Sequence, residues 1–204
     1  MNSRGILTSL LRSAARGAGT RLGRSGLAEL CRNALAELSP GRAGLSDAQL
    51  TRVVTRLPNV RTATVSSAQE KLRIDLGFDD GSELLMALVP GTIAFAPGGA
   101  KELCFSVEPA SAAHDGRARD VVAAIAGEIA RALWRPALAG APHADHAAFV
   151  STENEQLVVD LRNVPDVRWA LQQGLRAAII EAIKPRALEA RGGHLALPLS
   201  VHLR

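Results

Sequence analysis

Large aromatic side chains are scarce in this sequence. Only 3% of the 204 residues are aromatic: there is no tyrosine, and the rings are two tryptophans and four phenylalanines. Because stacking on aromatic side chains is a main source of affinity for unpaired bases, this composition disfavours a nucleobase-binding surface. Hydrophobic residues still make up 47% of the chain. We therefore expect a core of leucine, valine, isoleucine and alanine.

Cysteine and long hydrophobic runs are also lacking. The two cysteines, Cys31 and Cys104, are too few for a disulfide framework and lack the CxxC spacing of a metal or redox site. We expect both to be small buried residues. No stretch approaches the ~18 consecutive apolar residues of a membrane span, and no continuous apolar region marks a secretory signal. These absences favour a cytoplasmic or peripheral membrane location.

Positive charge is concentrated at the start of the chain. The formal net charge is +4, but residues 1–27 hold five arginines and no acid, which leaves the rest of the chain near neutral at −1. A domain that binds DNA or RNA would be expected to carry its own basic patch. We therefore expect no nucleic-acid partner.

Residues 1–26 are expected to form an extension that is separate from the folded body. Apolar residues from Ile6 to Leu22 recur at spacings of three and four, which indicates a basic amphipathic helix able to bind a peripheral membrane surface. The acid-free, arginine- and serine-rich start is also typical of a mitochondrial targeting segment. Five glycines, each costing up to about 1 kcal/mol of helix stability, favour a disordered extension instead. The three alternatives stay open.

Residues 27–204 are predicted to form a single α+β domain. Helical spacing and capping residues predict four helices, at 27–38, from the Ser46 cap to Leu57, from Asp115 to Trp134 before Pro136, and from an Asp166 cap to Ile183 before Pro185. Alternating apolar residues predict strands at 72–78, 84–89, 92–96 and 102–107, a strand pair within 149–161, and a hairpin across 191–193. The first four strands should form an antiparallel meander with one apolar face.

An internal repeat is predicted, with copies at about 46–134 and 120–204. Thr64–Leu76 matches Phe149–Leu161 at six of thirteen positions, and Phe95–Val107 matches Glu189–Val201 around a shared Gly-Gly pair. Between the two matches, the second copy should hold a helix where the first has strands and a tight turn. The alternative is two unrelated hairpins with similar turn residues. Duplication predicts curved antiparallel sheet units, each preceded by a helix.

No residue pattern in the sequence indicates catalysis. Residues 143–146 (His-Ala-Asp-His) are the one cluster of metal-capable side chains, but a metal site needs three or four converging ligands, so we expect a solvated loop and no metal. Motifs of the GxSxG, HExxH, P-loop and dinucleotide-binding kinds do not occur. Asp75 and Asp160 hold equivalent repeat positions, yet alternation favours solvated strand faces over an acid–base pair. We expect neither a catalytic residue nor a cofactor.

The stretch from Gln156 to Leu203 carries a family resemblance. There LVVDLRNVP leads into the helix VRWALQQGLRAAIIEAI and then into the strands RALEARGGHLALPLSV. This order resembles bacterial relatives of the tubular lipid-binding superfamily. The resemblance implies a curved sheet wrapped on a helix, with a groove for acyl chains.

These observations favour non-catalytic binding of a lipid or another apolar ligand, between the C-terminal helix and the strands after it. That helix is apolar over a wider arc than a one-sided packing contact requires. The candidate ligand-binding residues are Trp169, Leu171, Leu175, Ile179, Ile180, Ile183, Leu197, Leu199 and Val201. In the alternative, Trp169 and Ile180 pack on the first half of the body, and the protein is an assembly protein forming a homodimer without a small ligand.

Overall fold

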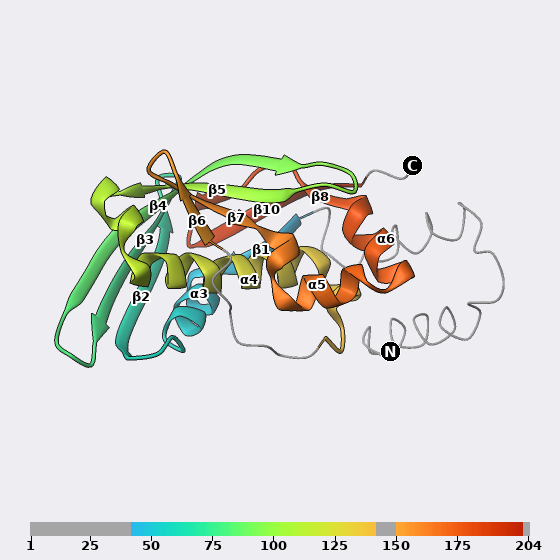
Figure 1. Ribbon diagram of the computed structural model, residues 1–204. Coiled ribbons are helices and arrows are strands. Elements are labelled where there is room, and N and C mark those ends of the chain that lie inside the picture. The colour runs from blue at the N-terminus through green and yellow to red at the C-terminus, as the bar shows by residue number, and fades with distance from the viewer. Residues whose placement is uncertain (1–41, 142–149, 202–204) are drawn as a thin grey trace.

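A curved antiparallel sheet packed around one long helix is the centre of the structure. The computed structural model describes residues 42–141 and 150–201. In Figure 1, helix α4 (Gly116–Leu138) runs along the molecule beneath strands β4 and β5, with hairpin β2–β3 at one end and helix α6 at the other. The predicted α+β class is confirmed. The predictions for residues 1–41 and for the loop at 143–146 lie outside the described residues.

Two sheets and four α-helices make up the described chain. The large sheet has the order β2–β3–β4–β5–β7–β6, and its strands are β2 (Val60–Ala68), β3 (Lys71–Phe78), β4 (Glu83–Phe95), β5 (Lys101–Glu108), β6 (Val150–Glu153) and β7 (Gln156–Asp160). The smaller sheet contains β1 (Arg42–Ser46), β8 (Ile183–Pro185), β9 (Glu189–Arg191) and β10 (His194–Val201). The other helices are α3 (Asp47–Val54), α5 (Pro165–Leu171) and α6 (Gly174–Ala182), with short 3-10 helices η2 (Ala110–His114) and η3 (Leu161–Asn163).

Local signals place several elements as predicted. Ser46 caps α3: its hydroxyl accepts from the Gln49 N–H at 3.2 Å, and the Gln49 side chain accepts from the Ser46 N–H at 2.8 Å. Asp115 caps α4 through the N–H of Arg117 at 2.8 Å. On β3, apolar side chains alternate inward with polar ones outward. These elements follow directly from residue type and spacing.

The two segments of the first sequence match form equivalent hairpins. Hairpin β2–β3 turns at Gln69–Glu70 and hairpin β6–β7 at Asn154–Glu155, and all four residues have positive φ, as a two-residue type I′ turn requires. They form opposite edges of one sheet. The segments of the second match lie in different sheets, as β4–β5 and β9–β10. The duplication itself stays a prediction.

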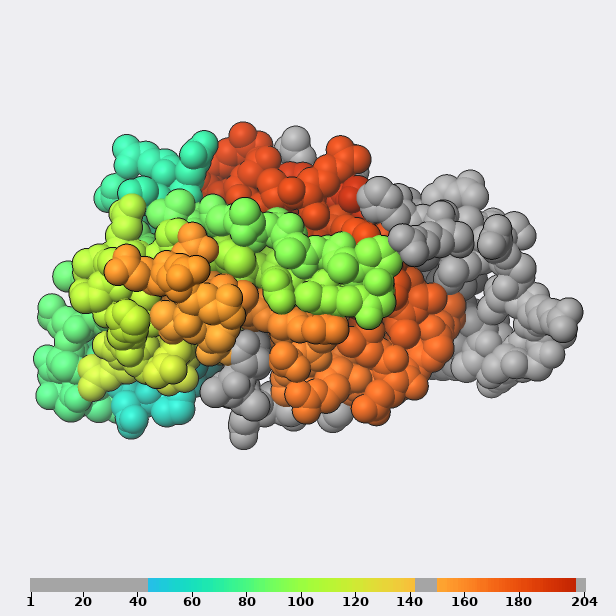
Figure 2. All heavy atoms as spheres, turned by 45° about the horizontal axis from the view of Figure 1, so that its top comes forward, coloured from blue at the N-terminus to red at the C-terminus, as the bar shows by residue number. Residues whose placement is uncertain are grey.

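Strand β4 corrects the prediction of two strands at 84–89 and 92–96. It is one strand of 13 residues, with a register shift against β5 between Pro90 and Ile93. Proline lacks the N–H that a ladder bond needs, and a Cβ on Gly91 would lie 3.2 Å from the Cys104 carbonyl oxygen. The irregularity therefore bends the strand without ending it. In Figure 2 the β4–β5 hairpin crosses the face, with the C-terminal strands on one side and β6, β7 and α5 on the other.

The helix predicted from Asp115 to Trp134, before Pro136, leaves helical geometry at Trp134 (φ −119°, ψ 29°). Beyond this kink a last helical turn that contains Pro136 extends α4 to Leu138. The kink is stabilised because the buried Trp134 indole donates to the Ile183 carbonyl at 3.1 Å. The kink is the local effect expected of Pro136, and tertiary packing holds the turn that follows it.

The predicted C-terminal helix is two helices. Its cap is Val164 and not Asp166, with Pro165 in the first turn of α5. Asp166 is buried and forms an ion pair with Arg131 of α4, Nε to Oδ2 at 3.0 Å. The chain leaves helical geometry at Gln172–Gln173, begins α6 at Gly174, and enters β8 at Ile183. The Asp166 side chain therefore joins two helices and does not cap one.

Helix α4 is the core of the domain. Of its 23 residues, 16 are buried, so it has neighbours on nearly all sides. Small side chains, including Ala118, Ala124, Ala126 and Ala130, are 0–1% exposed. They allow close approach of the surrounding elements, which include α3, α5, α6 and the large sheet. Within the described ranges no helix is both long and apolar enough to cross a bilayer.

Candidate functional site

The predicted ligand-binding residues lie mostly inside the core. Ile179, Ile180, Ile183 and Leu197 are fully buried, and Leu199 is 8% exposed. Half-buried side chains packed against the same core are Trp169, Leu171 and Leu175. Val201 ends β10, and its side chain lies outside the description. These residues lie close together as expected, but they pack against one another in the core and do not line an open groove.

Polar contacts hold α6 against its surroundings. Arg176 donates to the carbonyls of Ala137 and Ala139 at 2.6 and 2.8 Å, beyond the kink in α4, and its guanidinium lies 4.6 Å from the Trp169 ring centroid. Burial lowers the pKa of Arg176 below its ordinary value. On the opposite side Glu181 accepts from the Gly98 N–H at 2.8 Å. This helix is therefore fixed at both ends.

A buried lysine completes the attachment of α6. Lys101, at the start of β5, is 0% exposed, and its Nζ donates to the carbonyls of Ala96 at 2.7 Å and Gly99 at 3.2 Å. The same Nζ lies 3.1 Å from a Glu181 carboxylate oxygen. The tip of hairpin β4–β5 is thus fastened to α6. Neither of the two cavities described below has any of the nine predicted residues in its lining.

The other side chains that the sequence suggested for chemistry are far apart or already hydrogen-bonded to neighbours. Asp75 on β3 and Asp160 on β7 have strands β4 and β5 between them. Burial raises the pKa of Asp160, but hydrogen bonds from Arg162 and from backbone N–H groups outweigh this effect and leave the pKa below its ordinary value. Cys104, expected to be buried, is half-buried on the outward side of β5. In the part of the chain that the structure describes, no three His, Cys, Asp or Glu residues could hold a metal ion.

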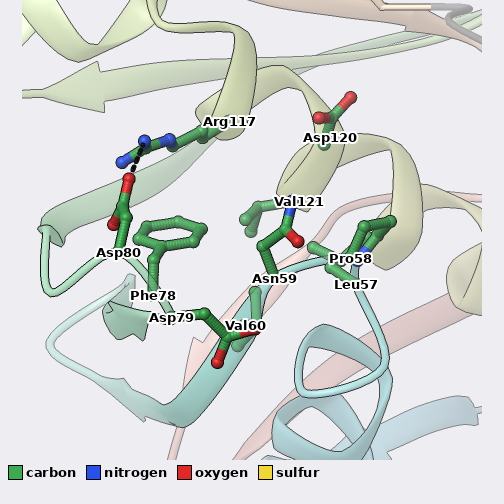
Figure 3. A pocket seen from close by; sticks show the side chains of 10 residues that line it. All are labelled: Leu57, Pro58, Asn59, Val60, Phe78, Asp79, Asp80, Arg117, Asp120 and Val121. Atoms are coloured by element: carbon green, nitrogen blue, oxygen red, sulfur yellow. Dashed lines mark hydrogen bonds and ion pairs between the residues drawn. The ribbon is translucent and has the colours of Figure 1, made fainter.

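A cavity of ≈490 Å³ opens at the end of the molecule where the α3–β2 loop, the β3–β4 turn and the start of α4 meet (Figure 3). We call it the end cavity. Its floor is apolar, formed by the buried Phe78 and Val121 and the half-buried Leu57 and Val60, with the exposed Pro58 at its margin. Its rim is polar, formed by Asn59, Asp79, Asp80, Arg117 and Asp120. This arrangement of residues suits a ligand in which an apolar group is attached to a polar one.

Backbone contacts shape the end cavity. Asn59 has a φ of 64°, which reverses the chain before β2, and its carbonyl accepts from the Asp79 N–H at 2.9 Å. This bond joins the α3–β2 loop to the β3–β4 turn. In that turn Gly81 has a φ of 81°, and the Ser82 N–H donates to the Asp80 carboxylate at 2.9 Å. The walls of the end cavity are therefore fixed by hydrogen bonds.

Negative charge predominates at the rim. Arg117 lies over the Phe78 ring, 4.3 Å from its centroid, and pairs with Asp80 at 3.1 Å (Figure 3). The hydroxyl and N–H of Ser82, together with Arg117, hold the pKa of Asp80 below its ordinary value. Asp79 and Asp120 are exposed and form no ion pair with any described residue. With three carboxylates and one guanidinium, the rim attracts cations.

A second, shallower hollow of ≈600 Å³ lies on the side of the large sheet that faces away from α4. Strands β2, β3 and β4 line it, with Glu108 and Pro109 at its border. Leu85, one of its lining residues, is 61% exposed and is the one large apolar side chain that is exposed among the described residues. We call this surface the outer face and define it by Thr64, Ser66, Arg73, Asp75, Leu85 and Ala87.

Sequence reasoning missed both surfaces. The end cavity joins the Asp79-Asp80-Gly81 turn to the start of α4, and no local pattern shows that contact. Leu85 could have been found: if Leu84 points inward on a strand, its neighbour Leu85 must point outward. The run Leu84–Val89 was too apolar for alternation to show the solvent side.

Comparisons with known proteins add no relative. No family model matches the chain, and neither the search of curated proteins nor that of solved structures finds a match. The resemblance to the tubular lipid-binding superfamily therefore stays a prediction.

Proposed function

We propose that this protein binds, without converting it, a small ligand whose apolar part enters the end cavity and whose polar part is neutral or positively charged. The observation that carries the proposal is the apolar floor beneath an acidic rim. Small-molecule sites typically enclose about 300–1,000 Å³ with mostly apolar walls and a few placed polar groups. The end cavity, at ≈490 Å³, lies within this range of volume, and its lining is more polar than is typical, with five apolar and five polar residues.

The rim charge selects between classes of apolar ligand. Two unit charges 4 Å apart interact by about 1 kcal/mol in bulk water and about 4 kcal/mol at an effective dielectric constant of 20. Asp79, Asp80 and Asp120 would therefore repel the carboxylate of a fatty acid and attract an alkylammonium group. The proposal keeps apolar-ligand binding and moves it from the α6–β10 region to the end cavity. Membrane binding through residues 1–26 stays a separate prediction.

The test compares three probes with the same alkyl chain: octylamine, octanol and octanoate, titrated into the full chain by calorimetry at neutral pH. We expect octylamine to bind most tightly and octanoate at least about tenfold more weakly, equivalent to about 1.4 kcal/mol. Asp120→Asn should weaken the binding of octylamine severalfold and leave the binding of octanol unchanged, because only the charge is removed. Val60→Trp should weaken the binding of all three probes by filling the cavity.

The control is Val158→Trp, the same substitution at a half-buried position of β7 outside the cavity lining. It should leave binding of all three probes unchanged. If neither octylamine nor octanol binds, the proposal is wrong. If octanoate binds best, the site lies elsewhere and the rim argument fails.

A further inference from the structure

Charge on the outer face is arranged so that the face complements a second copy of itself. The ladder between β3 and β4 places Asp75 opposite Leu85 and Arg73 opposite Ala87. The ladder between β2 and β3 places Thr64 opposite Asp75 and Ser66 opposite Arg73. Two adjacent rows therefore cross the three strands, one containing Asp75 and Leu85, the other Arg73 and Ala87.

The charges of these two rows are available for a partner. Arg73 bonds only to the Gln69 side chain, at 3.1 Å, and neither Arg73 nor Asp75 has an ion-pair partner among the described residues. In the next row Lys71 is already paired with Glu108 at 2.7 Å. The free charges of the outer face are thus one cation and one anion, two residues apart on the same strand.

A two-fold axis that runs between the two rows, parallel to the sheet and perpendicular to its strands, exchanges them. Each Asp75 then faces Arg73 of the other copy, and each exposed Leu85 lies over the small Ala87 of the other copy. Thr64 and Ser66 face each other in the same way. An isologous dimer interface must be self-complementary in this sense, with residue i on j and j on i.

We propose that the outer face is the contact surface of a homodimer, in which Leu85 of each copy packs beside two Asp75–Arg73 ion pairs that fix the register between the copies. The hollow of ≈600 Å³ beside Leu85 receives the Leu85 side chain of the second copy. Among the described residues, this is where a large apolar side chain is exposed. The ion pairs on β3, beside the apolar contact on β4, fix the orientation of the two copies. The proposal does not depend on the ligand of the end cavity.

The test is sedimentation velocity of the full chain, from about 1 μM to about 1 mM, a range that covers weak dimers. The unmodified chain should form dimers as its concentration rises. Leu85→Asp should weaken the dimer by about a hundredfold or more, because the substitution occurs twice in each interface and replaces its large apolar contact with a charge. The melting temperatures of dilute samples verify that the variants fold.

Charge exchange tests the register. Arg73→Asp alone and Asp75→Arg alone should each weaken the dimer at least about tenfold, because like charges then face each other. The double variant Arg73→Asp with Asp75→Arg should restore it, since the pairs are remade with reversed sign. Arg119→Asp, an exposed position on α4 away from the outer face, is the matched control and should have no effect.

Three results would each overturn the proposal. The first is a chain that stays monomeric to millimolar concentration, and the second is a dimer that Leu85→Asp leaves intact. The third is a double variant, Arg73→Asp with Asp75→Arg, that dimerises as weakly as either single variant.

Discussion

Replacing the buried ammonium of Lys101 tests how α6 is held on the large sheet. In Lys101→Met the apolar stem is kept while Nζ is removed, together with its bonds to the Ala96 and Gly99 carbonyls and to Glu181. Glu181 keeps its bond from the Gly98 N–H. The perturbation therefore isolates the charge and its donors from the packing of the side chain.

The loss of folding stability caused by Lys101→Met can be bounded from these contacts. Breaking a buried ion pair typically costs about 3–5 kcal/mol because the remaining charge is left without a partner. The Glu181 side chain is 32% exposed, so water replaces part of what it loses. Removing the ammonium also relieves the cost of burying it. We expect a net loss of about 2–3 kcal/mol, which for a chain of this size lowers the melting temperature by about 4–12 °C.

Urea and thermal unfolding of the full chain, followed by circular dichroism, measure this loss. The matched control is Lys184→Met, because among the described residues the half-buried Lys184 makes one long bond, to the Phe95 carbonyl at 3.4 Å. It should cost under about 1 kcal/mol. In a Glu181→Gln background the effect of Lys101→Met should shrink, since the two residues share one interaction. A Lys101→Met protein as stable as the unmodified chain would refute the reasoning.

Three further predictions follow from single contacts. Because the pKa of Asp160 is lowered in the folded state, its contribution to stability is complete at pH 7 and is lost as pH falls from about 4 through the lowered pKa; urea titrations at successively lower pH should therefore show the unmodified chain approaching the stability of Asp160→Asn. Ile180→Trp should destabilise the fold by about 1–3 kcal/mol in thermal unfolding, because the fully buried site has no room, and an unchanged midpoint would indicate an open groove. Arg176→Lys should lose about 1 kcal/mol in urea titration, because lysine cannot donate to two carbonyls while lying flat on Trp169; full stability would contradict this geometry.

Elements specified by adjacent residues were predictable from the sequence. The cap at Ser46, the start of a helix at Asp115 and the alternation along β3 each depend on side chains a few positions apart, and the structure confirms them. The proline rules placed the ends of regular helix near Trp134 and Ile183, but not the turn of helix beyond Trp134. Pro136 lies beyond a kink that a hydrogen bond from Trp134 to Ile183 stabilises, and a partner 49 residues away has no local signal.

The candidate site was less predictable than the fold, for a related reason. Ile179 and Ile180 were expected to line a groove because α6 is apolar over a wide arc, and that arc is instead surrounded by core on more than one side. Amphipathic width indicates how much surface a helix must bury but not against what. The end cavity needs Phe78 and Arg117 to meet, and that contact exists only in the folded chain.

Pairing between β1 and β10 also has a consequence for synthesis of the chain. Arg42 lies opposite Pro198, so one of the earliest described strands finds its partner only when one of the last has left the ribosome. Until then the buried side chains of β10, including Leu195 and Leu197, are missing from the core, and the surfaces they cover stay open to water. Such late closure slows folding and lengthens the period in which exposed apolar surface can aggregate. A nascent chain stalled before β10 should therefore depend on chaperones far more than the completed protein does.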